Sequence, residues 1–351
     1  MEYDDFELEI DARDGREYSV AIINSPAGEA RSKMIFPFDE LALENQILHL
    51  QNALLRSGGK YRKSPLPDEQ VVQEFGQALF DAVMVSEIRS LYDMSQLQAD
   101  QKGKGLRLKL RILSPRLAAL PWEFLYDPRQ GEYITLSRRT PLIRYIDLPK
   151  PPQPLTVELP LRILGMIVSP QDMQALDVQK ERQRVERAIE LLQKQNQINL
   201  TWLQGHTWRD LQQAMRSGSW HIFHFIGHGG FDKNTDEGFV ILADEQNQAR
   251  PLVATQLARM LADHQSLRLV MLNACDGAKA GQTDVFSSTA SILIRRGVPS
   301  VVAMQYEITD RAAIEFARSF YEAVSDGAPV DMAITEARKG VSFALNTLVT
   351  S

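Results

Sequence analysis

The strongest constraint on the fold is a pair of short apolar runs, at residues 220–226 and 268–272, that each stop near a small residue. Runs of this length that are rich in Phe, Ile, Val and Leu are typical of buried strands in a parallel sheet. His228 follows the first run and Cys275 follows the second. Because sites in open α/β sheets form outside the carboxyl ends of the strands, we expect the imidazole and the thiol to meet there if the two strands are neighbours.

The pattern around these two runs predicts an α/β core. Alternating strands and helices favour a mostly parallel sheet that is flanked by helices. Residues 238–243 are expected to form a small excursion beyond the main sheet. The predicted strands cover 161–169, 198–203, 220–226, 268–272 and 300–304, and the predicted helices cover 176–195, 207–216, 254–263, 284–296, 310–325 and 329–347.

A proline-rich segment separates this core from the N-terminal part of the chain. Residues 147–154 contain four prolines, which fix φ and remove backbone donors, so we predict a stiff extended connector. We therefore expect an N-terminal α+β portion over 1–155 and the core over 156–351. The N-terminal portion is predicted to contain a hairpin within 1–24, helices over 39–57 and 68–93, a strand over 106–113 and a strand pair within 133–146.

Composition narrows the class of protein. The net charge of −6 and the lack of a basic cluster argue against direct nucleic-acid binding. No run of 18 apolar residues and no export signal is evident, so we expect neither a membrane span nor secretion. The single cysteine allows no internal disulfide, which fits a reducing cytoplasm.

Cys275 is the only thiol of the chain, and a lone Cys with a distant His is a nucleophile signature. A neighbouring imidazole raises the thiolate fraction, and the thiolate is the reactive form. The glycines after His228 leave room for backbone N–H groups to turn toward a substrate carbonyl. We expect the backbone N–H groups of Gly229 and Cys275 to form an oxyanion hole.

Other site chemistries fit the residues less well. His224, His228 and Cys275 could suggest zinc, but four residues of strand span about 13 Å, which is too far for ligands of one ion. A Gly-x-Ser-x-Gly elbow is missing, and the glycines at 227–230 lack the Lys and hydroxyl residue of a phosphate loop. We therefore expect no metal and no cofactor.

At these residues the sequence resembles CHAT domains, which are caspase-like cysteine proteases related to caspases, metacaspases and separase. The resemblance rests on residues 224–230 and 272–277, with support from 120–126 and 299–304, and it covers roughly residues 100–345. It implies a caspase-like fold and a cysteine endopeptidase, a thiol protease with a His228–Cys275 dyad that needs no third member. It also implies regulated limited proteolysis in bacterial antiviral defence or programmed cell death, with a gasdermin-like or nucleic-acid-sensor-linked target.

The resemblance also implies where the first substrate pocket lies. In the family this pocket draws on the end of the first core strand, on the position two before the Cys and on the strand after it. The corresponding residues here are Asp172, Asn273, Gln305, Tyr306 and Glu307. Relatives that cut after Arg or Lys tend to carry an acid where this chain has Asn273, although Asp172 or Glu307 could restore a basic preference.

Several alternatives stay open at this level. The chain could be a catalytically silent scaffold for protein–protein interaction. The abrupt end in an apolar helical stretch fits a fragment of a longer protein or a protease controlled by a separate partner, sensor domain or subunit. Because some relatives use calcium, metal-dependent ordering of loops is also open. We expect activation to move the loops at 231–238 and 276–284.

Overall fold

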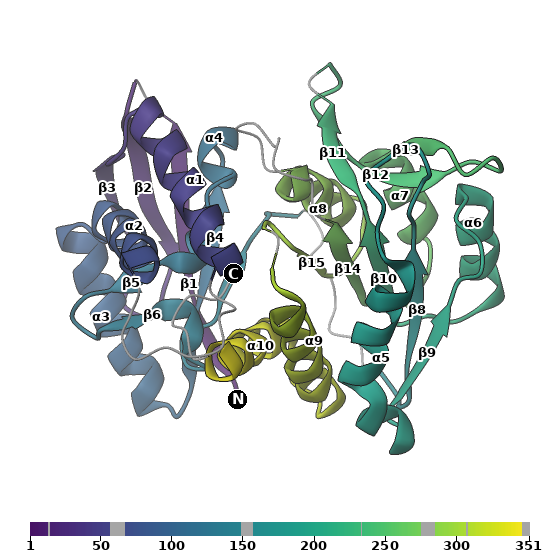
Figure 1. Ribbon diagram of the computed structural model, residues 1–351. Helices are drawn as coiled ribbons and strands as arrows, with labels where there is room; N and C mark the ends of the chain where they lie inside the picture. Colours follow the sequence, from purple (N-terminus) through teal and green to yellow (C-terminus); the bar gives the residue numbers. More distant parts are fainter. Residues whose placement is uncertain are drawn as a thin grey trace. The chain divides into compact units, whose positions relative to one another are not determined.

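The computed structural model describes residues 1–12, 15–56, 67–148, 157–232, 234–274, 285–306 and 308–345. The predicted proline-rich connector falls largely outside these ranges. The chain divides into two compact units. Figure 1 colours the chain by residue number, from the N-terminus to the C-terminus. The first unit comprises Met1–Asp147, Ile308–Ala323 and Ala328–Ser351, and the second comprises Leu148–Glu307 and Val324–Gly327.

The first unit contains a five-stranded mixed sheet with the strand order β3-β2-β1-β4-β7. The pairs β1–β2 and β2–β3 are antiparallel, whereas β1–β4 and β4–β7 are parallel, so the predicted hairpin within 1–24 is confirmed. The strands are β1 (Tyr3–Ala12), β2 (Glu17–Asn24), β3 (Ala30–Ile35), β4 (Gly105–Ile112) and β7 (Leu142–Arg144).

The predicted strand pair within 133–146 is wrong. β6 (Glu132–Tyr133) pairs with β5 (Tyr126–Asp127), while β7 adds to the main sheet beside β4. Strands of two or three residues are too short to show a period of their own, so their partners are chosen by the surrounding structure.

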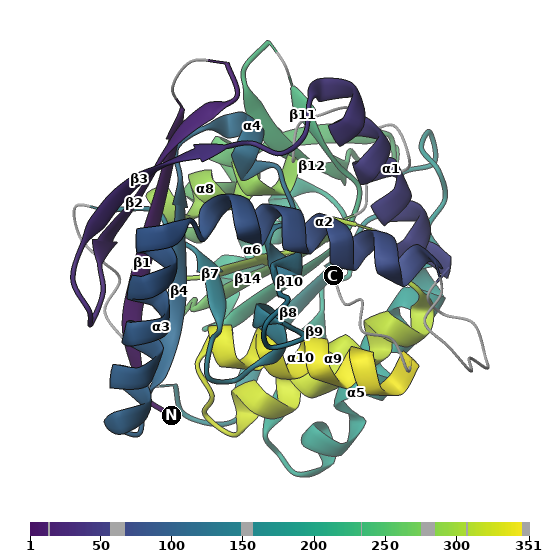
Figure 2. The same cartoon turned by 90° about the vertical axis from the view of Figure 1, so that its left-hand side faces the viewer.

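The helices of the first unit pack their apolar faces inward. The single helix predicted over 68–93 is two helices, α2 (Pro67–Val83) and α3 (Ser86–Gln101), separated by Val85 in an extended conformation. Val72, Phe75, Leu79 and Val83 form the buried apolar face of α2, and α3 lies beside β1, β3 and β4 (Figure 2). The other elements of this unit are α1 (Glu40–Arg56), α4 (Pro115–Ala118), η1 (Trp122–Phe124), η2 (Ile134–Leu136), most of α9 (Asp310–Ser325) and α10 (Val330–Leu345).

The second unit is built on a five-stranded sheet in which every described pair is parallel, with the order β15-β14-β10-β8-β9 (Figure 1). Helices alternate with these strands along the chain, so the predicted α/β class, a mostly parallel sheet flanked by helices, is confirmed. The elements are β8 (Leu161–Ile167), α5 (Val178–Lys194), β9 (Ile198–Trp202), α6 (Trp208–Ser217), β10 (Ile222–Gly227), α7 (Ala254–Leu261), β14 (Leu269–Ala274), α8 (Val285–Arg295) and β15 (Val301–Ala303).

A small antiparallel sheet leaves the main sheet after β10. It consists of β11 (Gly229–Asp232), β12 (Glu237–Ala243) and β13 (Ala249–Val253), in the order β11-β12-β13. The excursion predicted at 238–243 is therefore confirmed, and β12 is its central strand. Val240 and Leu242 of β12 are buried with the core of the main sheet.

A large buried cluster of the second unit lies on one face of its main sheet. Register places Leu164, Phe223 and Val270 in one row and Met166, Phe225 and Leu272 in the next, and all six are buried. Buried residues of α6, α7 and α8 complete this cluster. Burial of each large side chain stabilises the fold by about 1.5–3 kcal/mol, which holds β10 and β14 side by side. Among the described helices of the whole chain, none is long and apolar enough to span a membrane.

Candidate active site

The carboxyl ends of the central strands stop at one level. β10 and β14 are parallel neighbours, and their last paired residues are Gly227 and Ala274. His228 directly follows the first of these residues, and Cys275 directly follows the second in the sequence. Cys275 and the predicted loop at 276–284 lie outside the described residues. The neighbouring position of the two strands, on which the expected meeting of imidazole and thiol depends, is observed.

A glycine is required where β10 turns into β11. A Cβ atom on Gly227 would lie 2.6 Å from Cζ of Phe225 and 3.4 Å from the carbonyl oxygen of Val168. Val168 itself continues β8, and its N–H donates to the Ile226 carbonyl at 2.9 Å. The aromatic core therefore reaches up to the residue before His228 and leaves no space for a side chain there.

His228 is buried, and its imidazole is held by the main chain. Nε2 lies 2.8 Å from the carbonyl oxygen of Gln174. Because a carbonyl oxygen can only accept, this contact assigns the proton to Nε2, and a neutral ring then carries its lone pair on Nδ1. Nδ1 is thus the nitrogen that can take up a proton. Sequence reasoning missed Gln174, because the contact is made by a backbone carbonyl that every residue type possesses.

The residue after His228 presents its N–H away from the small sheet. Gly229 is opposite Val240, and the N–H of Ile241 donates to the His228 carbonyl at 2.8 Å. In an antiparallel ladder this pattern makes Gly229 and Val240 a pair without direct hydrogen bonds, so the Gly229 N–H points away from β12. That direction is compatible with the predicted oxyanion-hole donor.

The predicted pocket residues have different surroundings. Asn273 is half-buried in β14 opposite Ile226, one residue before Gly227 of β10. Gln305 and Tyr306 follow β15 and are half-buried, and Glu307 lies outside the described residues. Asp172 is exposed, and its Oδ1 accepts a hydrogen bond of 2.8 Å from the N–H of Ala249, at the start of β13. The structure thus places Asn273 beside the end of β10 and engages Asp172 with β13.

Both ends of the loop predicted to move at 231–238 belong to the small sheet. Phe231 is opposite Gly238, and Asp232 is opposite Glu237, so the described ends of this segment are rungs of the β11–β12 ladder. Oδ1 of Asp232 also accepts a hydrogen bond from the N–H of Asn234 at 2.9 Å. Movement of this hairpin on activation stays a prediction.

The other histidines of β10 and its approach are structural. His224 is buried in mid-strand between Gly165 and Met271, and burial lowers its pKa to about 4. Burial, followed by the charges of Arg162 and Arg268, also lowers the pKa of His221. Among the described residues, no group of three His, Cys, Asp or Glu side chains is arranged to hold a metal ion.

His224 makes the stability of the second unit depend on pH. The unfolded side chain binds a proton near pH 6.5, whereas the folded one binds it only near pH 4. Between these values the unfolded state binds more protons, so the free energy of unfolding falls as the pH falls, by about 2 kcal/mol at pH 5. Urea unfolding at pH 7, 6 and 5 should show this fall, with a shallower slope in His224→Leu. An unchanged slope would contradict the assignment, and His264→Leu, which removes a partly exposed imidazole, is the control.

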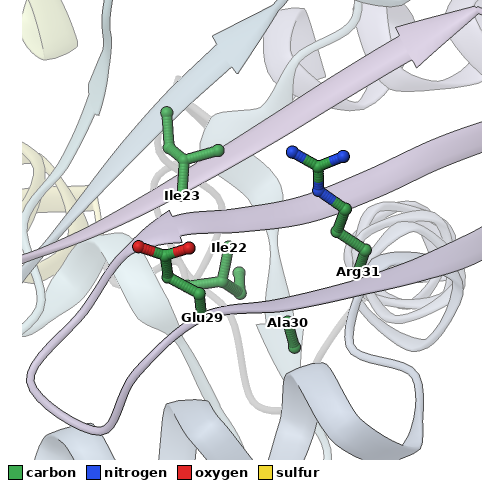
Figure 3. A pocket seen from close by; sticks show the side chains of 5 residues that line it. All are labelled: Ile22, Ile23, Glu29, Ala30 and Arg31. Atoms are coloured by element: carbon green, nitrogen blue, oxygen red, sulfur yellow. The ribbon is translucent and has the colours of Figure 1, made fainter.

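A hollow of about 420 Å³ lies elsewhere, at the edge of the first unit's sheet (Figure 3). Its lining contains no nucleophile and no residue of the second unit, so it carries no part of the chemistry described above. The lining residues are Ile22, Ile23, Glu29, Ala30 and Arg31.

Comparison with known proteins identifies a family and a similar fold. The family model of the CHAT domain matches residues 73–344. The structure is similar to that of the Saccharomyces cerevisiae separase–securin complex, with a TM-score of 0.53 and 10% identity, covering 97% of this chain and 29% of the separase chain. Gingipain R (RGPB), an Arg-specific cysteine proteinase, matches with a TM-score of 0.40 and 12% identity, covering 80% of this chain and 66% of its own. None of the curated proteins matches the sequence. The separase match confirms the predicted caspase-like fold class.

Proposed function

Because the chain belongs to the CHAT domain family, we propose that it is a caspase-like cysteine endopeptidase with the dyad His228 and Cys275. The observation that carries this proposal is the register of β10 and β14, in which Gly227 is opposite Ala274. The two residues that follow these in the sequence are the two reactive side chains. The bond from Nε2 of His228 to the Gln174 carbonyl supports it further, because it leaves Nδ1 as the base.

In the proposed reaction, Nδ1 of His228 takes the proton of the Cys275 thiol, and the thiolate attacks the carbonyl carbon of a peptide bond. The backbone N–H groups of Gly229 and Cys275 donate to the resulting oxyanion. The imidazolium then gives its proton to the amine, the C–N bond breaks, and water hydrolyses the thioester. The Gln174 carbonyl stabilises the imidazolium throughout by accepting from Nε2.

The wider role follows from the same family membership. We propose a protein substrate that is cut in a limited, regulated way in the cytoplasm, in bacterial antiviral defence or programmed cell death. A gasdermin-like or nucleic-acid-sensor-linked target would fit this role. The separase structure is a complex with securin, which supports control of this chain by a partner or sensor. The domain boundary near residue 155 stays a prediction.

The substrate pocket is proposed to draw on Asn273, Gln305, Tyr306 and Glu307. Of these, Asn273 has the most direct structural support, because it lies in β14 beside the end of β10. An amide at this position offers both a donor and an acceptor, so it does not by itself select a basic side chain. A preference for Arg or Lys would have to come from a carboxylate such as Glu307.

Thiol alkylation tests the dyad directly, because any thiol reagent reports on Cys275 alone. An unassisted thiol with a pKa near 8.5 is only about 3% thiolate at pH 7, so pairing with an imidazole should accelerate alkylation by about tenfold. We expect His228→Ala to remove this acceleration, whereas His264→Ala keeps the wild-type rate. The rates are measured with iodoacetamide between pH 5 and 9 by mass spectrometry.

The same measurement addresses a second function, a catalytically silent scaffold for protein–protein interaction. A scaffold has no need of an activated thiolate. Slow alkylation that is insensitive to His228→Ala would therefore favour the scaffold over the protease.

A further inference from the structure

We propose that Asp172 is a positioning residue, and that it joins the turn between β12 and β13 in a clamp that fixes the Gln174 carbonyl against His228. This inference rests on the proposed role of His228. It assigns Asp172 to the orientation of the imidazole instead of to the substrate pocket that the family resemblance implies.

The segment before Gln174 is tied to the turn by three hydrogen bonds. The N–H of Gln171 donates to the Asn247 carbonyl at 3.0 Å, and its Nε2 donates to the Gln246 carbonyl at 3.2 Å. Oδ1 of Asp172 accepts from the N–H of Ala249 at 2.8 Å. Gln171 and Asp172 are therefore both hydrogen-bonded to this hairpin. Asp172 lies two residues before Gln174, whose carbonyl accepts from the imidazole of His228.

The turn itself is rigid because it is built around one carboxylate. Oδ1 of Asp244 accepts from the N–H groups of Gln246 and Gln248 at 3.0 and 2.9 Å, and Oδ2 accepts from Nε of Arg250 at 3.1 Å. These bonds, chiefly the one from Gln248, hold the pKa of Asp244 below its ordinary value. Asn247 has φ 58°, a left-handed conformation that Asn tolerates well.

The other end of the segment is fixed as well. The hydroxyl of Ser169 accepts from the N–H of Leu176 at 3.0 Å, which closes a loop around Gln174. Asp177 then caps α5, with Oδ1 accepting from the N–H of Lys180 at 3.0 Å. The segment that contains Gln174 is therefore fixed at both ends, by the turn before it and by the start of α5 after it.

The β12–β13 hairpin thus positions both the main chain and the imidazole of His228. β12 holds the main chain of His228 directly, through the bond from Ile241 to its carbonyl. The turn that ends β12 holds the imidazole indirectly, through Asp172 and the Gln174 carbonyl. Because both paths start from one rigid element, the ring is held in place relative to its own backbone, as proton transfer to Nδ1 requires.

The role of Asp172 depends on its acceptor atom and not on its charge. One oxygen takes one backbone N–H, and an amide oxygen in Asp172→Asn can do the same. We expect Asp172→Asn to keep kcat and KM within about twofold of wild type, and Asp172→Ala to lower kcat about tenfold with KM unchanged, because a misplaced catalytic group slows chemistry without weakening binding. Gln171→Ala, which removes only the side-chain bond, should lower kcat less.

The tautomer of His228 provides a readout that needs no cleavage. In [15N]histidine-labelled full-length protein, the wild type and Asp172→Asn should show the His228 ring protonated at Nε2, with the signal assigned by its loss in His228→Gln. Asp172→Ala should shift this ring toward a mixture of tautomers, while the other histidine signals stay in place and report that the variant is folded. A wild-type tautomer and kcat in Asp172→Ala would overturn the clamp.

The preference of the enzyme among peptides distinguishes the positioning role of Asp172 from a role in the substrate pocket. If Asp172→Asn raises KM only for peptides with Arg or Lys at the cleaved position, Asp172 is a substrate acid and the clamp proposal is wrong. If no peptide is cut and Cys275 alkylates slowly in every variant, the proposed protease function fails, but the tautomer measurement still decides the clamp.

Discussion

Replacing Cys275 with Ala is expected to abolish peptide cleavage, lowering kcat/KM by at least about 10⁴-fold, because the reaction loses its nucleophile. His228→Gln should lower it by about 10²–10⁴-fold, because only proton transfer is lost. The assay is cleavage of a diverse peptide library, with the chain alone and with proteins from neighbouring genes. The cleaved peptides also reveal the preference of the pocket.

Controls make this result specific. Cys275→Ala should unfold like the wild type, and His264→Gln should cleave like it. Residual cleavage in Cys275→Ala would point to another nucleophile or to a contaminating protease. If the wild type cuts nothing under any condition, the alkylation rates decide between a missing activator and a scaffold.

The second large effect concerns a partly buried ion pair in the first unit. Arg144 donates from Nε to Oε1 of Glu123 at 2.9 Å and from Nη2 to Oε2 at 2.8 Å. Its guanidinium also donates to the carbonyls of Leu120 and Ala118. Burial alone would raise the pKa of Glu123, but the charge and hydrogen bonds of Arg144, with the charge of Arg338, lower it instead. The pair therefore joins η1 to β7 and to the end of α4.

Arg144→Met should reduce the free energy of unfolding of the first unit by about 3 kcal/mol, because the Glu123 carboxylate loses its nearest counter-ion and two charge-assisted hydrogen bonds. Urea unfolding at pH 7 measures this loss. The double variant Glu123→Leu with Arg144→Met should recover only part of this loss, because the buried Arg338 then loses the Glu123 carboxylate that its charge faces.

Lys33→Met is the matched control, because Lys33 forms an exposed ion pair with Glu17 in the same unit. The free energy of unfolding of this variant should stay close to that of the wild type. A wild-type unfolding curve for Arg144→Met would refute the structural role of the pair.

The sequence by itself determined the α/β class, the positions of the core strands along the chain and the candidate dyad. Strands such as β10 and β14 are identified by their own composition, because a buried parallel strand needs apolar side chains on both faces. His228 and Cys275 are identified by their reactive side chains at the ends of these strands. These signals are local, so they can be recognised in the sequence without knowledge of the fold.

Only the tertiary structure decided the pairing of the short strands, the break between α2 and α3, and the surroundings of His228. β7 has three residues, too few for a period, and its place beside β4 depends on the rest of the sheet. The role of Gln174 depends on a backbone carbonyl, and that of Asp172 on one distant N–H. Every residue carries the same carbonyl and nearly every one the same N–H, so which pair meets is set by the path of the chain in space and not by the residue types.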